Sequence, residues 1–283
     1  MSEDPSPGAT PDWAHSFGGV ADAYERARPT YPPEAAQWLV GQQAATVLEL
    51  GAGTGKLTEQ LVALGHGIVA TDPDQAMLDR LQRKLPEVST LVAHAEELPV
   101  GDHGFDAVVA AQAFHWFDLD RALPEIARAL KRGGRLGLVW NWRDDSIPWV
   151  RRLGTIIGTQ EQLAEPAQSL DDSGLFGPVE EARFTHWQQV DRKSIQDLVL
   201  SRSNIAVLDE EPRAAKLAEV VAFYDDYGRG MDGMQLPYTA SCFRAEVLDH
   251  VLPTVTEPTE QGELGENAVS DGSSTDMLLI DFR

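Results

Sequence analysis

A glycine-rich segment is the most chemically informative part of this sequence. It reads Glu49-Leu50-Gly51-Ala52-Gly53-Thr54-Gly55 and lies between an apolar run and a helix-like pattern. Glycines let a backbone turn tightly and approach a ligand without a Cβ in the way. A helix that follows directs free amides and the positive end of its dipole toward the same point. The segment is therefore typical of a site for a polar or anionic ligand head, although an ordinary tight strand-to-helix turn also uses glycines.

Three ligand classes compete for such a segment. A nucleoside triphosphate loop needs Gly, four residues and then Gly-Lys-Ser/Thr, but Leu50 and Leu57 stand where the first glycine and the hydroxyl belong. A dinucleotide loop needs its third glycine three positions after the second, and Lys56 occupies that place. The pattern Glu/Asp-x-Gly-x-Gly-x-Gly of S-adenosylmethionine sites fits the segment as it stands.

An acidic residue after the next apolar run strengthens the third interpretation. Asp72 follows Gly67-Ile68-Val69-Ala70-Thr71, and an acid at the end of such a strand can accept hydrogen bonds from both ribose hydroxyls of a nucleoside. The alternative is that Asp72 or Asp74 only caps the following helix. We expect Asp74 to be the cap, because Pro73 between the two acids makes Asp72 a poorer one.

Alternating strands and helices must position these residues. Short apolar runs predict strands at 46–50, 67–71, 90–92, 105–111 and 135–140. Helical spacing predicts helices over 54–64, over the segment that carries Met77, Leu78, Leu81 and Leu85, and over 120–130, with Gly133 and Gly134 ending the last. Strands alternating with helices of this length imply parallel β-α-β units, and hence an open Rossmann-like α/β sheet with helices on both faces.

The regular alternation weakens after residue 142. Residues 143–180 have a helical and loop-like pattern, which we interpret as a cap insertion after the fifth strand. Further along, the pattern predicts a strand at 184–190, helices at 193–203 and 212–227, and a last strand at 238–247. We interpret these as the remaining edge of the same sheet, which is then mostly parallel with one antiparallel strand near the edge.

The two ends of the chain differ in composition from the domain between them. Residues 1–15 are rich in Pro, Ser, Asp and Gly and are expected to be flexible. Residues 251–283 form an acidic tail whose stretch 252–276 contains no Lys or Arg, and we expect it to be disordered. The domain itself spans residues 16–250.

Composition excludes several classes of protein. The 283 residues include one cysteine, Cys242, so neither an intrachain disulfide nor a cysteine-based zinc cluster is possible. We see no secretory signal, no run near the ~20 apolar residues of a membrane helix and no metal-ligand cluster, and we expect a cytoplasmic protein that needs no metal. The net charge of −22 repels phosphate backbones. The basic cluster Lys131, Arg132 and Arg135 is interpreted as the favourable C-terminal end of a helix.

Four stretches in this order resemble the class I S-adenosylmethionine-dependent methyltransferases, in the group that includes the quinone-biosynthesis and trans-aconitate type enzymes. They are Val47–Gly55, Asp72, Ala93–Pro99 and Ala111–Phe117, and the resemblance extends over roughly residues 15–142. His94 departs from the third motif, which is usually Gly-Asp/Thr-Ala-Glu-x-Leu-Pro. The resemblance implies that S-adenosylmethionine is bound by Glu49, Gly51, Ala52, Gly53, Gly55, Asp72, Pro73, Met77, His94, Ala95, Glu96, Ala111 and Gln112.

The N-terminal stretch Ala23–Pro32 resembles the lid segment of this family, assigned here to residues 16–32. The resemblance implies that Tyr24, Arg28 and Tyr31 reach the cofactor carboxylate or the acceptor. The alternative is a surface helix that leads to the next helix at Pro32-Pro33.

Aromatic residues and one histidine follow the fourth and fifth predicted strands. The acceptor pocket is expected to be lined by Phe114, Trp116, Trp140, Asn141 and Trp142, with core packing as the alternative. His115 would lie at the carboxyl end of the sheet, where ligands bind. We identify it as the candidate catalytic base, unless it only orders its own loop through a backbone hydrogen bond.

The sequence thus predicts an S-adenosylmethionine-dependent methyltransferase (class EC 2.1.1.-) acting on a small-molecule acceptor. An O, N, C or S atom of the acceptor would attack the activated methyl in line, and alignment alone lowers such a barrier by several kcal/mol. One alternative is a catalytically inactive cofactor-binding sensor or partner protein, which predicts a damaged motif. A nucleic-acid or protein methyltransferase is less favoured, because the chain is acidic and we see no basic patch. The sequence leaves the acceptor and the oligomeric state open.

Overall fold

A computed structural model describes residues 28–158, 166–201, 205, 208–227 and 233–249. The expected flexible N-terminus, the part of the lid with Tyr24 and the acidic tail lie outside these residues. Among the helices of the described part, none is long and apolar enough to cross a membrane.

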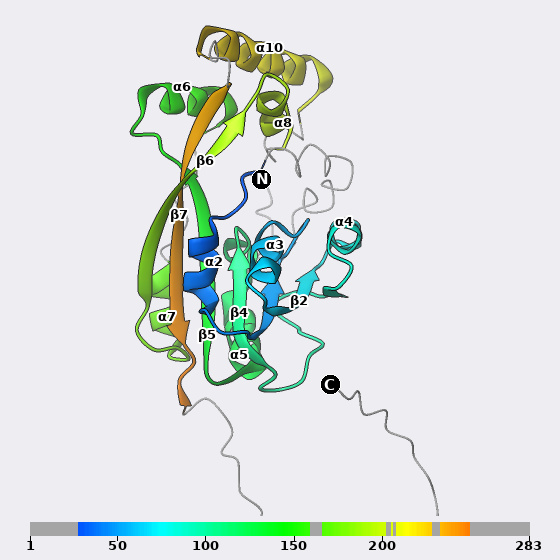
Figure 1. The fold of residues 1–283 in the computed structure, drawn as a ribbon, viewed down its shortest axis with the longest axis vertical. Coiled ribbons are helices and arrows are strands. Elements are labelled where there is room, and N and C mark those ends of the chain that lie inside the picture. Colours follow the sequence, from blue (N-terminus) through cyan, green and yellow to red (C-terminus); the bar gives the residue numbers. More distant parts are fainter. Residues whose placement is uncertain (1–27, 159–165, 202–204, 206–207, 228–232, 250–283) are drawn as a thin grey trace, which may run out of the picture. The chain divides into compact units, whose positions relative to one another are not determined.

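One mixed sheet organises the described residues (Figure 1). Its order is β3-β2-β1-β4-β5-β7-β6, and β7 runs antiparallel to both of its neighbours while the strands from β3 to β5 are parallel. The strands are β1 Thr46–Leu50, β2 Gly67–Asp72, β3 Ser89–Val92, β4 Phe105–Ala111, β5 Leu130–Arg143, β6 Glu180–Val190 and β7 Met234–Glu246. The predicted Rossmann-like sheet with one antiparallel strand near its edge is confirmed.

Helices cover both faces of this sheet, because each strand alternates its apolar side chains between two layers. In β1, Val47 packs in one layer with Leu39 and Leu57, whereas Leu48 packs in the other with Ile126. The first layer holds α2 Pro33–Val40, α3 Lys56–Ala63 and α4 Gln75–Lys84, and the second holds α5 Leu119–Ala129 and α7 Pro166–Ser173 (Figure 1).

A third apolar cluster lies where β6 ends and β7 begins. It joins Val190 and Leu236 of these strands to α6 Pro148–Ile157, α8 Ser194–Leu200 and α10 Glu210–Tyr227. The predicted insertion at 143–180 therefore contributes to two layers. Its first helix, α6, belongs to this third cluster, and its second helix, α7, packs against α5 through Leu170.

The junction of α5 and β5 corrects one prediction. Gly133 and Gly134 do not end the helix, because α5 stops at Ala129 and β5 begins directly at Leu130. Leu130 is fully buried and pairs with Phe105, after which the β4–β5 register shifts. Gly133 has a φ of +68°, and a Cβ on Gly134 would lie 2.7 Å from a backbone oxygen. The two glycines therefore allow the irregular backbone that interrupts the β4–β5 pairing inside this strand.

The basic cluster consequently lies at the start of β5 and not at a helix end. Lys131 donates to the carboxylate of Asp106 at 2.8 Å, Arg132 forms an ion pair with Asp249 at 3.3 Å, and Arg135 lies 3.9 Å from a carboxylate oxygen of Glu246. Each of the three cations is thus matched by a carboxylate on a neighbouring element, and the helix dipole does not explain the cluster.

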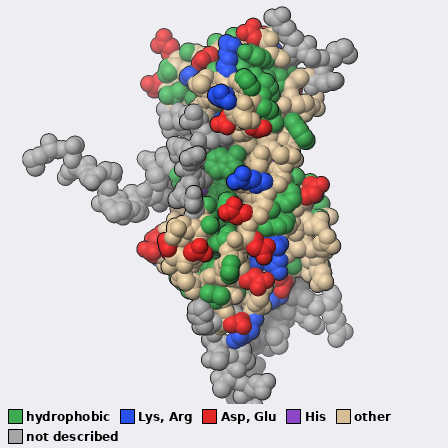
Figure 2. Space-filling model, turned by 90° about the vertical axis from the view of Figure 1, so that its left-hand side faces the viewer, with side chains coloured by type: hydrophobic (Ala, Val, Ile, Leu, Met, Phe, Trp, Pro, Cys, Tyr) green, Lys and Arg blue, Asp and Glu red, His purple; other side chains and the backbone are tan. Residues whose placement is uncertain are grey.

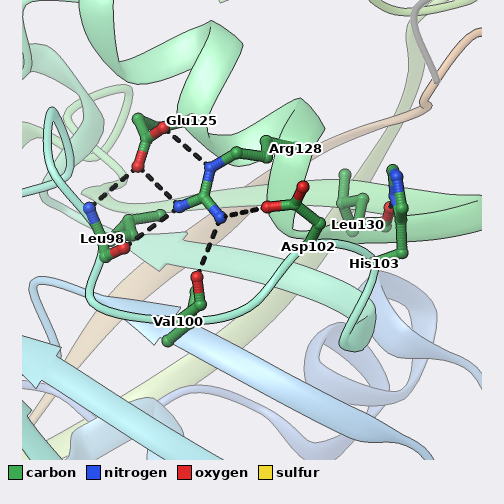
Figure 3. Close-up of polar contacts among 7 residues, drawn as sticks. All are labelled: Leu98, Val100, Asp102, His103, Glu125, Arg128 and Leu130. Carbon is green, nitrogen blue, oxygen red and sulfur yellow. Dashed lines mark hydrogen bonds and ion pairs between the residues drawn. The ribbon is translucent and has the colours of Figure 1, made fainter. Parts of the chain in front are cut away.

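Arg128 of α5 fixes the loop that joins β3 to β4 (Figure 3). Its guanidinium donates to the carbonyl oxygens of Leu98 and Val100 at 3.0 and 2.8 Å, and forms ion pairs with Asp102 and Glu125. Glu125 in turn accepts from the Leu98 amide at 3.0 Å. Because both carbonyl oxygens and the amide of this loop are hydrogen-bonded to side chains of one helix, the loop is fixed relative to α5. The cluster therefore positions the end of the third motif.

Candidate functional site

The glycine segment forms a left-handed turn at the carboxyl end of β1. Gly51, Gly53 and Gly55 have φ values of +64°, +55° and +85°, a region that L side chains rarely adopt. A Cβ on Gly51 would lie 2.6 Å from that of Ala113, so this position is needed for close packing against the fourth motif. A Cβ on Gly53 would meet nothing within 4 Å. Gly53 therefore faces open space, as a ligand cradle requires.

Asp72 joins the glycine segment to the end of β2. One carboxylate oxygen accepts from the Gly53 amide at 2.9 Å, and the other accepts from the Asp74 amide at 2.9 Å. Asp74 caps α4 by accepting from the Ala76 amide at 2.8 Å, which confirms the predicted cap. Burial raises the pKa of Asp72, and the two backbone hydrogen bonds oppose that effect. Each oxygen keeps a further lone pair, so the carboxylate can accept from ligand hydroxyls as well.

Glu49 is a second buried carboxyl group beneath the turn. Its side chain is 1% exposed and accepts from the Thr58 hydroxyl of α3 at 2.7 Å. Burial raises its pKa to about 8, the Thr58 hydrogen bond opposes the rise, and the charge of Asp72 adds to it. Sequence reasoning missed Thr58, although its place on the buried face of α3 beside Leu57 was the available signal.

A pocket opens beside this turn, at the carboxyl ends of β1, β4 and β5. Eight of the predicted site residues line it, namely Glu49, Gly51, Ala52, Gly53, Ala111, Gln112, Arg28 and Tyr31. Asn141, which was expected to line the acceptor site, also lines this pocket. Sequence reasoning did not select four other lining residues, Pro29, Thr54, Lys56 and Leu57. The strand order reverses between β1 and β4, and the pocket occupies that switch point, where ligands bind in open α/β sheets.

Thr54 provides a test of whether a polar ligand fits this pocket. Its hydroxyl oxygen is buried and has no hydrogen-bond partner among the described residues, although the residue lines the pocket. A buried hydroxyl without a partner is costly, and a ligand donor or acceptor would offset that cost. Thr54 and the open space at Gly53 therefore fit a ligand with polar groups, while Glu49 and Asp72 fit one that carries positive charge.

The remaining predicted cofactor residues lie outside the pocket lining. Gly55 is at the N-terminal end of α3, where a Cβ would lie 2.9 Å from Leu81, and Met77 is buried in α4. Glu96 accepts from the Asp118 amide at 2.7 Å, which joins the third motif to the start of α5. His94 is exposed, and its electrostatic interaction with Asp72 lowers the pKa of that carboxyl group. The other predicted cofactor residues that do not line the pocket are Asp72, Pro73 and Ala95.

The aromatic residues divide between core and surface. Trp140 is 2% exposed and makes edge contacts with Phe114 and Phe243, with ring centroids 6.3 and 5.8 Å apart. Trp142 packs against the same cluster, on the sheet face opposite Asn141. For Phe114 and Trp140 the structure therefore supports the core-packing alternative. Trp116, in the short helix η2 Phe114–Trp116, is 58% exposed.

Within the described part of the chain, His115 forms its hydrogen bond with a side chain and not with the backbone. Its Nδ1 accepts from the indole N–H of Trp140 at 3.4 Å, and its ring lies 4.4 Å from that of Trp116. Burial lowers its pKa to about 4. The ring is therefore neutral at pH 7, and the proton lies on Nε2 because Nδ1 accepts. This geometry favours an ordering role over that of a base. In the described residues, no group of three or more His, Cys, Asp or Glu could hold a metal ion.

Comparison with known proteins gives concordant results. Residues 48–138 match a family described as a methyltransferase domain. An uncharacterized methyltransferase of Mycobacterium tuberculosis (strain ATCC 25618 / H37Rv) is 43% identical over 83% of this chain and 96% of its own length. An uncharacterized methyltransferase of Schizosaccharomyces pombe is 37% identical over 71% of this chain and 85% of its own.

Solved structures extend the comparison. A putative type II methyltransferase from Anaeromyxobacter dehalogenans has a TM-score of 0.59 at 25% identity and covers 80% of this chain and 99% of its own. An N-methyltransferase of Haemonchus contortus, solved with phosphomonomethylethanolamine and S-adenosylhomocysteine, has a TM-score of 0.51 at 16% identity. That alignment covers 86% of this chain and 62% of the other, and it shows a shared fold.

Proposed function

This chain belongs to the class I S-adenosylmethionine-dependent methyltransferases, and we propose that it transfers the methyl group to a small-molecule acceptor by in-line attack. The observation that carries the proposal is the pocket at the switch point of the sheet. It joins an open glycine turn, an unsatisfied Thr54 hydroxyl and the buried carboxyl group of Glu49.

The residues around the pocket are suited to S-adenosylmethionine. When bound, the cofactor supplies a methyl group already activated on a sulfonium, so the protein contributes binding and alignment. Asp72 would accept from the ribose hydroxyls, and the turn from Gly51 to Thr54 would hold the amino-acid portion. Glu49 would lose its proton when a cationic group is bound nearby, because an opposite charge favours the ionised carboxyl.

The protein's own contribution to the rate would come mainly from positioning. Alignment of two reactants provides ~7–11 kcal/mol in ideal cases, and no catalytic base is then needed for an acceptor that is already nucleophilic. His115 would support this alignment by holding η2 against Trp140. Arg28 and Tyr31 line the pocket from the N-terminal side, which suits the predicted role of this segment in covering the site.

Two alternatives have less support. An inactive binding protein should carry a damaged motif, yet residues from the first and fourth motifs line the pocket. A nucleic-acid methyltransferase needs a basic face, whereas the chain has a net charge of −22. Figure 2 shows acidic and basic side chains interspersed over the described part of one face.

Calorimetry with S-adenosylmethionine and S-adenosylhomocysteine tests the cofactor site. We expect micromolar binding, about −8 kcal/mol, which Asp72→Ala weakens at least tenfold because it removes the ribose acceptor and the Gly53 contact. Asp79→Ala is the matched control, since Asp79 is an exposed acid of α4 whose carboxylate accepts from Gln75. An absence of heat with either ligand, or an equal loss in both variants, would refute the assignment of the site.

A methyl-transfer assay tests the acceptor class. The protein is incubated with methyl-labelled cofactor and, in separate reactions, with a small-molecule extract, total RNA, DNA and unfolded protein. We expect label only in the small-molecule fraction. Label in RNA, DNA or protein would overturn the acceptor class, and binding without any transfer would favour the sensor alternative.

A further inference from the structure

Asn141 lies at the centre of a hydrogen-bonded junction beside the pocket. It comes from the carboxyl-terminal part of β5, lines the pocket and is 5% exposed. Its side-chain nitrogen donates to the carbonyl oxygen of Thr30 at 3.1 Å, and its side-chain oxygen accepts from His186 Nε2 at 2.9 Å. Both polar atoms of this buried amide therefore have partners, which fix its orientation.

The two partners allow one arrangement of the amide. A carbonyl oxygen can only accept, so the Asn141 nitrogen faces Thr30 and its oxygen faces His186. His186 therefore carries its proton on Nε2, and burial lowers its pKa so that the ring is neutral at pH 7. The ring also stacks on Tyr238 of β7, with centroids 5.6 Å apart. The sheet thus holds the Asn141 donor in place toward Thr30.

Thr30 belongs to a segment that forms part of the pocket wall. Residues 28–32, which we call the strap, lead into α2 and have no regular secondary structure (Figure 1). Three of them line the pocket, namely Arg28, Pro29 and Tyr31. Thr30 itself is exposed, and its carbonyl oxygen is the group that Asn141 holds.

A second hydrogen bond fastens the strap to α3. Gln60 donates to the hydroxyl oxygen of Thr30 at 3.2 Å. This contact lies at the surface, where water competes for both groups, whereas the Asn141 amide is buried. The hydrogen bond from Asn141 is therefore the stronger of the two fastenings.

The backbone of Asn141 holds a second part of the pocket. Its carbonyl oxygen accepts from the side-chain amide of Gln112 at 3.1 Å, and the Gln112 N–H donates to the carbonyl oxygen of Val139 at 2.9 Å. Gln112 has a φ of +56°, which is unfavourable for a residue with a side chain, and the two hydrogen bonds to β5 offset that cost. One residue of β5 thus holds the strap through its side chain and the fourth motif through its backbone.

The size of the pocket makes one wall a moving part. The lining residues enclose about 50 Å³, whereas sites for small molecules usually measure ~300–1,000 Å³. Entry of a cofactor therefore requires a wall to move. The other walls belong to strands of the sheet, to the turns that follow them and to α3, so the strap, which has no regular structure, moves at the least cost.

We propose that Asn141 is a positioning residue that holds the strap closed over the bound cofactor. Breaking its hydrogen bond to Thr30 lets the strap open for entry and exit, and forming it again closes the site for methyl transfer. Asn141 acts through the strap and not on the reacting atoms. This inference rests on the proposed function, because it places the cofactor in this pocket.

The rates of cofactor binding test the inference. Tritium-labelled S-adenosylhomocysteine is bound, collected by rapid filtration and chased with unlabelled ligand, which gives the association and dissociation rate constants. Asn141→Leu should raise both at least fivefold, because a loosened strap eases entry and exit alike. Asn141→Asp keeps an acceptor for His186 but loses the donor to Thr30, and should do the same. Gln82→Leu is the matched control, since it removes an amide of α4 that donates to two backbone carbonyls, and it should change neither rate.

A nitroxide label on the strap gives a readout that needs no ligand. Thr30 is exposed and the single cysteine, Cys242, is buried, so a label on Thr30→Cys attaches to the strap alone. The backbone carbonyl that accepts from Asn141 is retained in this variant. We expect the electron paramagnetic resonance spectrum of an immobilised label, and the spectrum of a mobile label when Asn141→Asp is added. Gln82→Leu should leave the spectrum unchanged.

The outcomes separate this inference from the proposed function. If the Asn141 variants raise only the dissociation rate constant, Asn141 binds the cofactor directly and the inference is wrong, as it is if neither rate changes. Equal label mobility with and without Asn141→Asp would also overturn it. If Asn141→Leu does not fold, the nearly isosteric Asn141→Asp and the label still decide. A wild-type protein that binds no S-adenosylhomocysteine would refute the proposed function, and the label alone would then show whether Asn141 holds the strap.

Discussion

Replacing Glu49 with glutamine should raise the unfolding free energy relative to the wild type, and this gain should increase with pH. The carboxyl group is 1% exposed beneath the glycine turn, and burial raises its pKa from the ordinary value of 4.5 to about 8. Glutamine keeps the shape and the acceptor oxygen for the Thr58 hydroxyl, but it never ionises. The substitution therefore removes one titration and little else.

The sign and size follow from proton linkage. Between pH 4.5 and about 8 the folded protein keeps the proton on Glu49, whereas the unfolded chain releases it. Stability conferred by this residue is thus fully present below pH 4.5 and is lost as the pH rises toward 8. Each pH unit costs about 1.4 kcal/mol, so the whole window is worth at most about 5 kcal/mol. Between pH 5 and 7 the loss is about 2–3 kcal/mol.

Urea denaturation of the wild type and Glu49→Gln at pH 5, 6, 7 and 8 measures the effect. The difference in unfolding free energy should grow by about 1.4 kcal/mol per pH unit in favour of the variant. Other titrating groups are common to both proteins and cancel. Glu125→Gln is the contrasting control, because Arg128 lowers the pKa of Glu125 and its stabilisation is lost only as the pH falls below 4.5. A pH-independent difference for Glu49→Gln would refute the reasoning.

Two further substitutions test the supports of the site. Arg128→Met should lower the unfolding free energy by about 2–4 kcal/mol, because it leaves the carbonyls of the β3–β4 loop and Glu125 without their partner (Figure 3). Thermal unfolding measures this loss, and Arg121→Met, which removes an exposed arginine of the same helix, is the control and should shift the transition little. His115→Gln should leave the pH dependence of methyl transfer between pH 6 and 9 unchanged, because the pKa of His115 is about 4 and its Nδ1 accepts from Trp140; loss of a limb of the pH–rate profile would instead identify it as a base.

The sheet was predictable from the sequence where the strands are buried on both faces. The strands at 46–50 and 105–111 begin and end where the apolar runs predicted, because a continuous buried run has few alternatives. β6 and β7 extend beyond their predicted limits, to Glu180 and Met234. The added part of β6 carries polar residues, including Glu180, Glu181 and Arg183, and cross-strand pairing holds them in place although no apolar pattern marks them.

The sequence predicted those residues of the site whose role depends only on their neighbours in the chain. The glycine segment and Asp74 combine a residue type with a position, and each of them needs only its neighbours in sequence to be interpreted. Thr54, Thr58 and Asn141 gain their meaning from contacts across elements. Asn141 joins Thr30 to His186, which are separated from it by 111 and 45 residues. No single-sequence pattern contains that information.

The order of strands explains why residues from two motifs gather at one pocket. The order reverses between β1 and β4, and ligands bind at such a switch point in open α/β sheets. Glu49 and Gly51 come from the first motif, Ala111 and Gln112 from the fourth, and all four line the pocket there. Two motifs that are far apart in the chain therefore meet because of the sheet topology, and no local pattern in either motif could have placed one beside the other.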